Sequence, residues 1–139
     1  MTATVVSDSK DNIIGVATKK ILTKDVALGE AQTALLNVRT AVSCSVYSFI
    51  LEGDALNVVL AIQQPQLFEG WNFSNVVSDI FLYLHFFYSW KAEKVSRSTN
   101  FRARCLAKWA TSHLVFGNIS IRSSILSSIR NRSGKDHPL

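Results

Sequence analysis

The residues best suited to chemistry in this chain are basic and lie close together. Six lysines and arginines fall between positions 91 and 108, against a single acid, Glu93. They are Lys91, Lys94, Arg97, Arg102, Arg104 and Lys108. Positive charge confined to one segment favours a polyanionic partner, because neutralised phosphates release their counterions. A solvated helix face followed by a basic tail would carry the same charges, so charge alone leaves both interpretations open.

Two carboxylates stand at the ends of predicted elements. Glu30 lies at the start of a predicted helix, and Asp54 directly follows a predicted strand. Taken alone, Glu30 is typical of a residue that compensates the helix dipole. Likewise, Gly53 and Asp54 together are typical of a turn or a helix cap.

The cysteines and histidines do not form a metal or disulfide motif. Cys44 and Cys105 are too few and too far apart for a disulfide framework or a zinc site, and no histidine has a ligand spacing to them. We therefore expect reduced thiols. The first four residues lack a signal pattern, and the most apolar window, 80–90, is too short to cross a bilayer. These features predict a soluble, intracellular protein that does not associate with membranes.

The elements that must position these residues alternate between strand and helix. With 139 residues, 47% hydrophobic and 18% charged, the chain has the size and composition of one folded domain. Apolar periodicity predicts an α/β fold. The expected elements are a hairpin over 3–18, a helix from Gly29 to Val42, a strand over 47–52, a helix over 55–63 ended by Pro65, a helix over 73–84, a strand over 86–95 and a basic helix over 100–114. Residues 117–139 are expected to form a flexible basic tail rich in serine and arginine.

Four short segments in this order give the chain a resemblance to a known family. The segments are Gly29–Gln32, Leu51–Val59, Val95–Asn100 and Leu106–Ala110. Each is weakly specific alone, but their order and spacing resemble the plant ribonuclease H-like family, which is related to the ribonuclease H domain of reverse transcriptases. The resemblance covers about residues 3–116, which we take as the domain. It implies a mixed five-stranded sheet with flanking helices.

The resemblance also implies a reaction, the hydrolysis of RNA–DNA hybrids with two Mg²⁺ ions held by clustered carboxylates. In active members these are an Asp on the first strand, a Glu on the first helix, an Asp at the end of the fourth strand, and an Asp, Glu or His near the last helix. Glu30 matches the helix Glu and Asp54 matches the strand-end Asp. Two metal ions at the carboxyl ends of strands would stabilise the attacking and leaving oxygens.

Two of the four positions depart from this pattern. The strand with the first Asp is expected to precede the hairpin and is missing from this sequence; Asp8 and Asp11 fall in the hairpin turn instead. The fourth position is Arg104, which cannot bind a metal and whose positive charge opposes cation binding nearby. We therefore expect weak or absent Mg²⁺ binding and impaired hydrolysis.

The basic segment can retain nucleic-acid binding when hydrolysis is lost. Arg97, Arg104 and Lys108 are expected to contact phosphates, and Asn100 a phosphate or sugar. The expected partner is an RNA–DNA hybrid or duplex RNA. Trp90 and Trp109 are expected in the core rather than as stacking platforms.

Two alternatives remain. An active, metal-dependent hybrid ribonuclease would need its site completed by a partner chain or by another acid, such as Glu52 or Asp79. A protein-interaction module would use an open sheet edge, which accepts strands from a partner or from a second copy in a homodimer.

Overall fold

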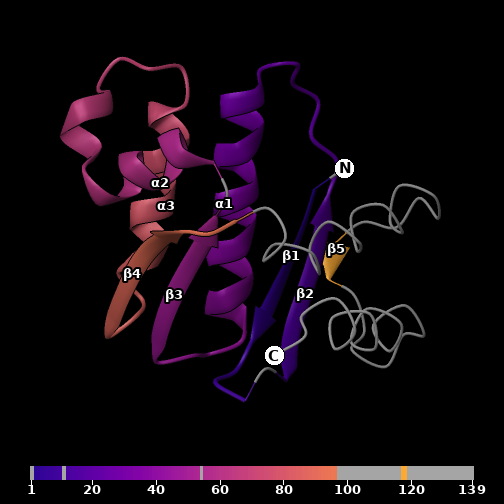
Figure 1. Ribbon diagram of the computed structural model, residues 1–139. Coiled ribbons are helices and arrows are strands. Elements are labelled where there is room, and N and C mark those ends of the chain that lie inside the picture. Colours follow the sequence, from indigo (N-terminus) through magenta and orange to yellow (C-terminus); the bar gives the residue numbers. More distant parts are fainter. Residues whose placement is uncertain (1, 11, 54, 97–116, 119–139) are drawn as a thin grey trace.

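The computed structural model describes residues 2–10, 12–53, 55–96 and 117–118. Up to residue 96 its elements follow the predicted order of strands and helices (Figure 1), and the basic helix predicted over 100–114 lies outside the described residues. In chain order they are β1 (Thr2–Ser7), β2 (Ile13–Lys19), α1 (Val26–Ser43), β3 (Ser48–Gly53), α2 (Leu56–Gln63), η1 (Pro65–Phe68), α3 (Ser74–Leu84), β4 (Ser89–Lys94) and β5 (Gly117–Asn118).

The first two strands form the predicted hairpin. β1 and β2 pair in antiparallel register, with Val5 opposite Val16, and the register shifts between Val6 and Ser7. The turn is held by Asp8, whose Oδ1 accepts hydrogen bonds of 2.9 Å from the backbone N–H groups of Lys10 and Asn12. A short acidic side chain is favoured at such a turn because it can bond to the backbone just ahead of it.

Helix α1 begins earlier than the sequence pattern indicates. It starts at Val26 because Asp25 caps it, accepting a 3.0 Å hydrogen bond from the Leu28 backbone N–H. The prediction that the helix starts at Gly29 is therefore wrong by one turn. Gly29 lies inside the helix, where its N–H bonds to the Asp25 carbonyl at 3.0 Å.

The second half of the fold contains a parallel strand pair that packs against α1 and α2. β3 and β4 pair in parallel, with Leu51 opposite Ala92, as expected for strands joined by helices. α2 ends at Gln63, and Pro65 then opens η1. The predicted strand 86–95 is shorter in the structure, since the chain before Ser89 turns rather than extends.

The described strands form two sheets rather than the single mixed sheet that was expected. One sheet has the order β1–β2–β5, and the other contains β3 and β4. Helix α1 packs against strands of both (Figure 1). Gly117 and Asn118 pair with Thr18 and Ala17 of β2, so these two residues belong to a sheet, whereas the rest of the predicted tail, 119–139, lies outside the described residues.

The core lies between α1, the two other α-helices and the sheets. Its largest fully buried side chains include Phe73, Ile62 and Ile80, and the small residues Ala31 and Ala41 of α1 are completely inaccessible. Small residues on α1 allow close approach of the helix to the strands, so this face fixes the position of the helix that carries Glu30.

No helix within the described ranges combines the length and apolarity that crossing a bilayer requires.

Candidate nucleic-acid and metal site

Glu30 is the candidate metal ligand that the structure describes. It lies on α1 and is half-buried. Because α1 begins at Val26, Glu30 is the fifth residue of the helix, and the first turn carries no acid. The prediction that Glu30 sits in the first turn is therefore wrong, and compensation of the helix dipole explains this residue less well, since that effect fades beyond the first turn.

Asp54 lies outside the described residues, but the chain on both sides of it is placed. Gly53 is the last residue of β3, and Ala55 immediately precedes α2. Figure 1 shows that β3 and β4 run opposite in direction to α1, so their carboxyl ends point towards the end of the domain where α1 begins. Carboxylates from different elements can converge where strands end in this way.

The two acids considered as replacements lie on different elements. Glu52 is exposed on β3, in register with Glu93 of β4, and Asp79 is exposed on α3. Among the described residues, no group of three His, Cys, Asp or Glu side chains is arranged to hold a metal ion. Glu30 alone does not make a Mg²⁺ site, because such an ion needs several oxygen ligands. The second candidate ligand, Asp54, lies outside the described residues, so the ligand set that the resemblance implies stays a prediction.

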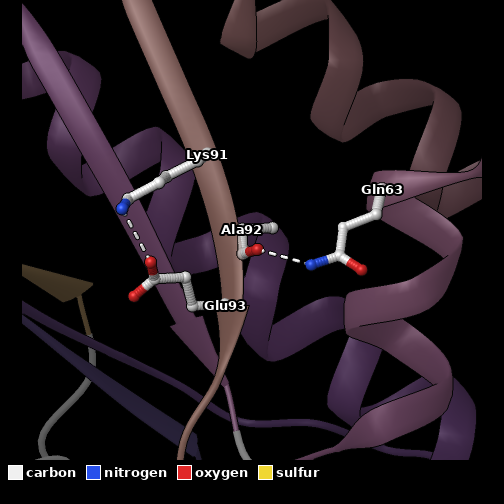
Figure 2. Close-up of polar contacts among 4 residues, drawn as sticks. All are labelled: Gln63, Lys91, Ala92 and Glu93. Atoms are coloured by element: carbon white, nitrogen blue, oxygen red, sulfur yellow. Dashed lines mark hydrogen bonds and ion pairs between the residues drawn. The ribbon is translucent and has the colours of Figure 1, made fainter.

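One residue of the basic segment of residues 91–108 already forms an ion pair. Lys91 and Glu93 form an ion pair of 2.8 Å on the exposed face of β4 (Figure 2). Lys94, at the end of the same strand, is exposed. The predicted nucleic-acid contacts Arg97, Asn100, Arg104 and Lys108 all lie outside the described residues.

The loop between η1 and α3 adds an aromatic residue that sequence reasoning missed. Asn72 donates a hydrogen bond from its side chain to the carboxylate of Asp25, which fixes this loop to the start of α1. The neighbouring Trp71 is 45% exposed. The available signal was the dense aromatic run from Phe68 to Phe73, but its arrangement depends on Asp25, which lies far away in the sequence.

A comparison with protein-family models matches residues 1–110 to the family described as reverse transcriptase-like. The chain belongs to this family. The resemblance noted from the sequence is thereby confirmed, and the reverse transcriptase-like domain is of the ribonuclease H type. None of the curated protein sequences matches the chain.

The structure of this reverse transcriptase-like domain is similar to a solved ribonuclease. The crystal structure of RNase H1 from the halophilic archaeon Halobacterium salinarum NRC-1 superimposes with a TM-score of 0.72. The match has 19% sequence identity and covers 80% of this chain and 84% of that chain. The fold is therefore ribonuclease H-like, as the sequence predicted.

Proposed function

We propose that this ribonuclease H-like domain binds RNA–DNA hybrid or duplex RNA, and that its phosphodiester hydrolysis is impaired or absent. The observation that carries the proposal is membership of the reverse transcriptase-like family over residues 1–110. The basic segment of residues 91–108 supports it, since polyanion binding draws on such charge.

The proposed loss of hydrolysis rests on the candidate ligands. Arg104 stands where the resemblance calls for a fourth metal ligand. A guanidinium has no free lone pair with which to bind a metal ion, and its positive charge repels a divalent cation beside it. Glu30 and Asp54 remain, and two carboxylates compensate less of the dehydration of two Mg²⁺ ions than a full set does.

In this proposal the chain still binds the duplex through its basic segment, although it no longer holds the metal ions. Arg97, Arg104 and Lys108 contact phosphates, and Asn100 contacts a phosphate or a sugar. Phosphate contacts position a duplex without reading its sequence, so binding is expected to depend on duplex shape and salt.

The test is cleavage of an end-labelled RNA–DNA hybrid, first with Mg²⁺ and then with Mn²⁺, beside an Asp54→Asn control. We expect no cleavage, with the hybrid still bound in a low-salt mobility-shift assay. Cleavage that disappears in the control would establish an active enzyme instead. Neutralising Arg97, Arg104 and Lys108 together should weaken binding and flatten its salt dependence; equal binding by that variant would count against the proposed groove.

A second candidate function is the acceptance of a strand from a partner, most simply a second copy of this chain. Its support lies in the sheet edges. Within the described residues, β5 covers one side of β2, and Gln63 of α2 bonds to the outer side of β4, whereas β1 and β3 have no paired neighbour on their inner sides. Unpaired edges present backbone donors and acceptors for another strand. Sedimentation equilibrium tests this: a dimer that Val5→Pro in β1 abolishes would support the idea, and a monomer at all concentrations would reject it.

A further inference from the structure

One end of the domain carries four large apolar side chains that are exposed. They are Tyr47, Leu82, Phe86 and Tyr88, each between 66% and 77% exposed. Tyr47 and Tyr88 directly precede β3 and β4, and Figure 1 shows both strands starting at the end of the domain where α1 ends. Leu82 lies in the last turn of α3 and Phe86 in the chain that leads from α3 into β4. We call these four side chains the aromatic patch.

The two tyrosines are held in one arrangement by the strands that follow them. Their rings stack face to face, with centroids 4.7 Å apart and 11° between the planes. The backbone N–H of Tyr88 donates a 2.9 Å hydrogen bond to the Tyr47 carbonyl, and the hydroxyls of Ser48 and Ser89 lie 2.9 Å apart. The rings therefore lose little conformational freedom when a partner covers them, and tyrosine is enriched at the energetic centres of interfaces.

Leu82 and Phe86 share one side of the last helical turn. The backbone N–H of Phe86 donates a 3.0 Å hydrogen bond to the Tyr83 carbonyl, so this turn continues past the end of α3. Residues four apart on a helix lie on the same face. Leu84 and Phe87 are buried, so the core is reached from the other side of the turn and the face of Leu82 and Phe86 is left open.

The segments that carry the aromatic patch are free of permanent charge. Residues 40–51 and 80–90 contain no Asp, Glu, Lys or Arg, and His85 is their one histidine, although the whole chain has a formal net charge of +5. By contrast Leu22, which is 86% exposed, lies between two lysines. The aromatic patch therefore differs from other exposed apolar residues in lacking charged neighbours along the chain.

This absence of charge fits a second copy of the chain as the partner. In a two-fold dimer the same patch faces itself, so a charge near its centre would meet a like charge. Large side chains exposed to this degree each offer on the order of 100–150 Å², so the four together approach about 500 Å². That area is large for a monomer, whose biggest apolar patch is about 300–600 Å². It also supplies more than half of the about 800 Å² that each partner buries in a standard interface.

We propose that the aromatic patch is the contact surface of a two-fold homodimer, with Phe86 and Tyr88 of both copies at its centre. The proposal does not rest on nucleic-acid binding. It uses side chains at the starts of β3 and β4 rather than the backbone edges of the sheets. The carboxyl ends of these strands point away from the patch, so both copies keep that end of the domain uncovered.

Sedimentation equilibrium of the full chain, freed of nucleic acid, measures the dimer directly. We expect Phe86→Ser and Leu82→Lys each to raise the dimer Kd at least about tenfold, because both copies carry the substitution. Phe86→Tyr keeps an aromatic ring and should retain the dimer. Leu22→Ser is the matched control, since it removes an exposed apolar side chain from the loop between β2 and α1, and it should leave the Kd unchanged.

The salt dependence adds a readout that a folding defect would not produce. Salt screens the repulsion between two chains of net charge +5, so the wild-type dimer should tighten as salt rises. A monomer at all concentrations, an unchanged Kd in Phe86→Ser, or an equal loss in Leu22→Ser would overturn the proposal. A dimer that Val5→Pro dissociates and Phe86→Ser does not would assign self-association to the edge of β1 instead. Hybrid binding by a monomeric chain would leave the proposed function intact.

Discussion

The backbone of Gly15 in β2 lies directly against the Sγ atom of Cys44, the C-cap residue of α1. A methyl group on Gly15 would overlap this sulfur and also touch Thr40 and Val6. The thiol in turn lies 3.7 Å from the Ile14 carbonyl, to which it donates. This contact seats the end of α1 on the hairpin, and it requires glycine for space rather than for backbone conformation.

Gly15→Ala should therefore destabilise the domain through overpacking, by about 1–3 kcal/mol in the free energy of unfolding. Removing the sulfur relieves the overlap, so the double variant Gly15→Ala/Cys44→Ala should lose less than the sum of the two single variants. Urea denaturation of all four proteins measures this coupling. Strict additivity would show that the sulfur is not what crowds position 15.

The hairpin turn gives a dependence of stability on acid pH. The hydrogen bond from the Asn12 backbone N–H is the main cause that lowers the pKa of Asp8, and Asn12's side chain and the Lys10 N–H add to it. A carboxyl whose pKa is lowered by folding stabilises the folded state above its unfolded pKa of about 3.9, and this contribution is lost as the pH falls through the folded pKa. Asp8→Ala should thus be less stable than the wild type near pH 7, with the difference shrinking towards pH 2.

Asp8→Asn is the matched control for this titration. The amide oxygen can accept the same backbone hydrogen bonds but does not titrate. Thermal unfolding across pH 2–7 should show a constant difference between Asp8→Asn and Asp8→Ala. A difference between wild type and Asp8→Ala that does not change with pH would contradict the assignment.

Asp25, the N-cap residue of α1, accepts two hydrogen bonds that can be tested separately. Asp25→Ala removes both the cap on the Leu28 N–H and the bond to Asn72, and it should cost about 1 kcal/mol or more of stability. Asn72→Ala removes the bond to the loop alone and should cost less. Denaturant midpoints compare the two variants. If Asn72→Ala costs as much as Asp25→Ala, the bond to the loop accounts for the whole effect and the cap contributes nothing.

Gln63 covers the outer edge of β4 by donating a 2.7 Å hydrogen bond from Nε2 to the Ala92 carbonyl (Figure 2). Gln63→Glu has nearly the same shape but replaces the donor with an acceptor, so at neutral pH it should destabilise more than Gln63→Ala. We expect about 0.5–1.5 kcal/mol for the loss of the bond alone. Chemical denaturation at pH 7 provides the comparison, and equal stability of Gln63→Glu and wild type would mean that the bond contributes nothing.

Local patterns were sufficient to predict most elements of this fold. The hairpin and the two helices that follow β3 repeat their apolar residues at the expected periods. The start of α1 was missed because Gly29 resembles a boundary, although Asp25 supplies the true cap. The strand predicted over 86–95 was too long, because Phe87 packs on Phe49 at 4.9 Å within a turn rather than in an extended run.

Features that depend on distant contacts could not be read in the same way. Which strands pair is decided across many residues, so the division into two sheets has no local signature. For the candidate site, Glu30 and Asp54 came from the family resemblance and not from their spacing. The loop that carries Trp71 is tied to the start of α1 by a bond between Asn72 and Asp25, two residues that periodicity does not connect.

The division into two sheets has a consequence for how the domain opens. Since no described backbone hydrogen bonds link β1 to β3, the ladder of each sheet can exchange its amide protons without breaking the other. Helix α1 packs on both sheets, so its buried turns are released only when both have separated from it. Native-state hydrogen exchange should then resolve two cooperative units that share one slowly exchanging helix, with the turns around Ala31 and Val38 reporting the global free energy of unfolding.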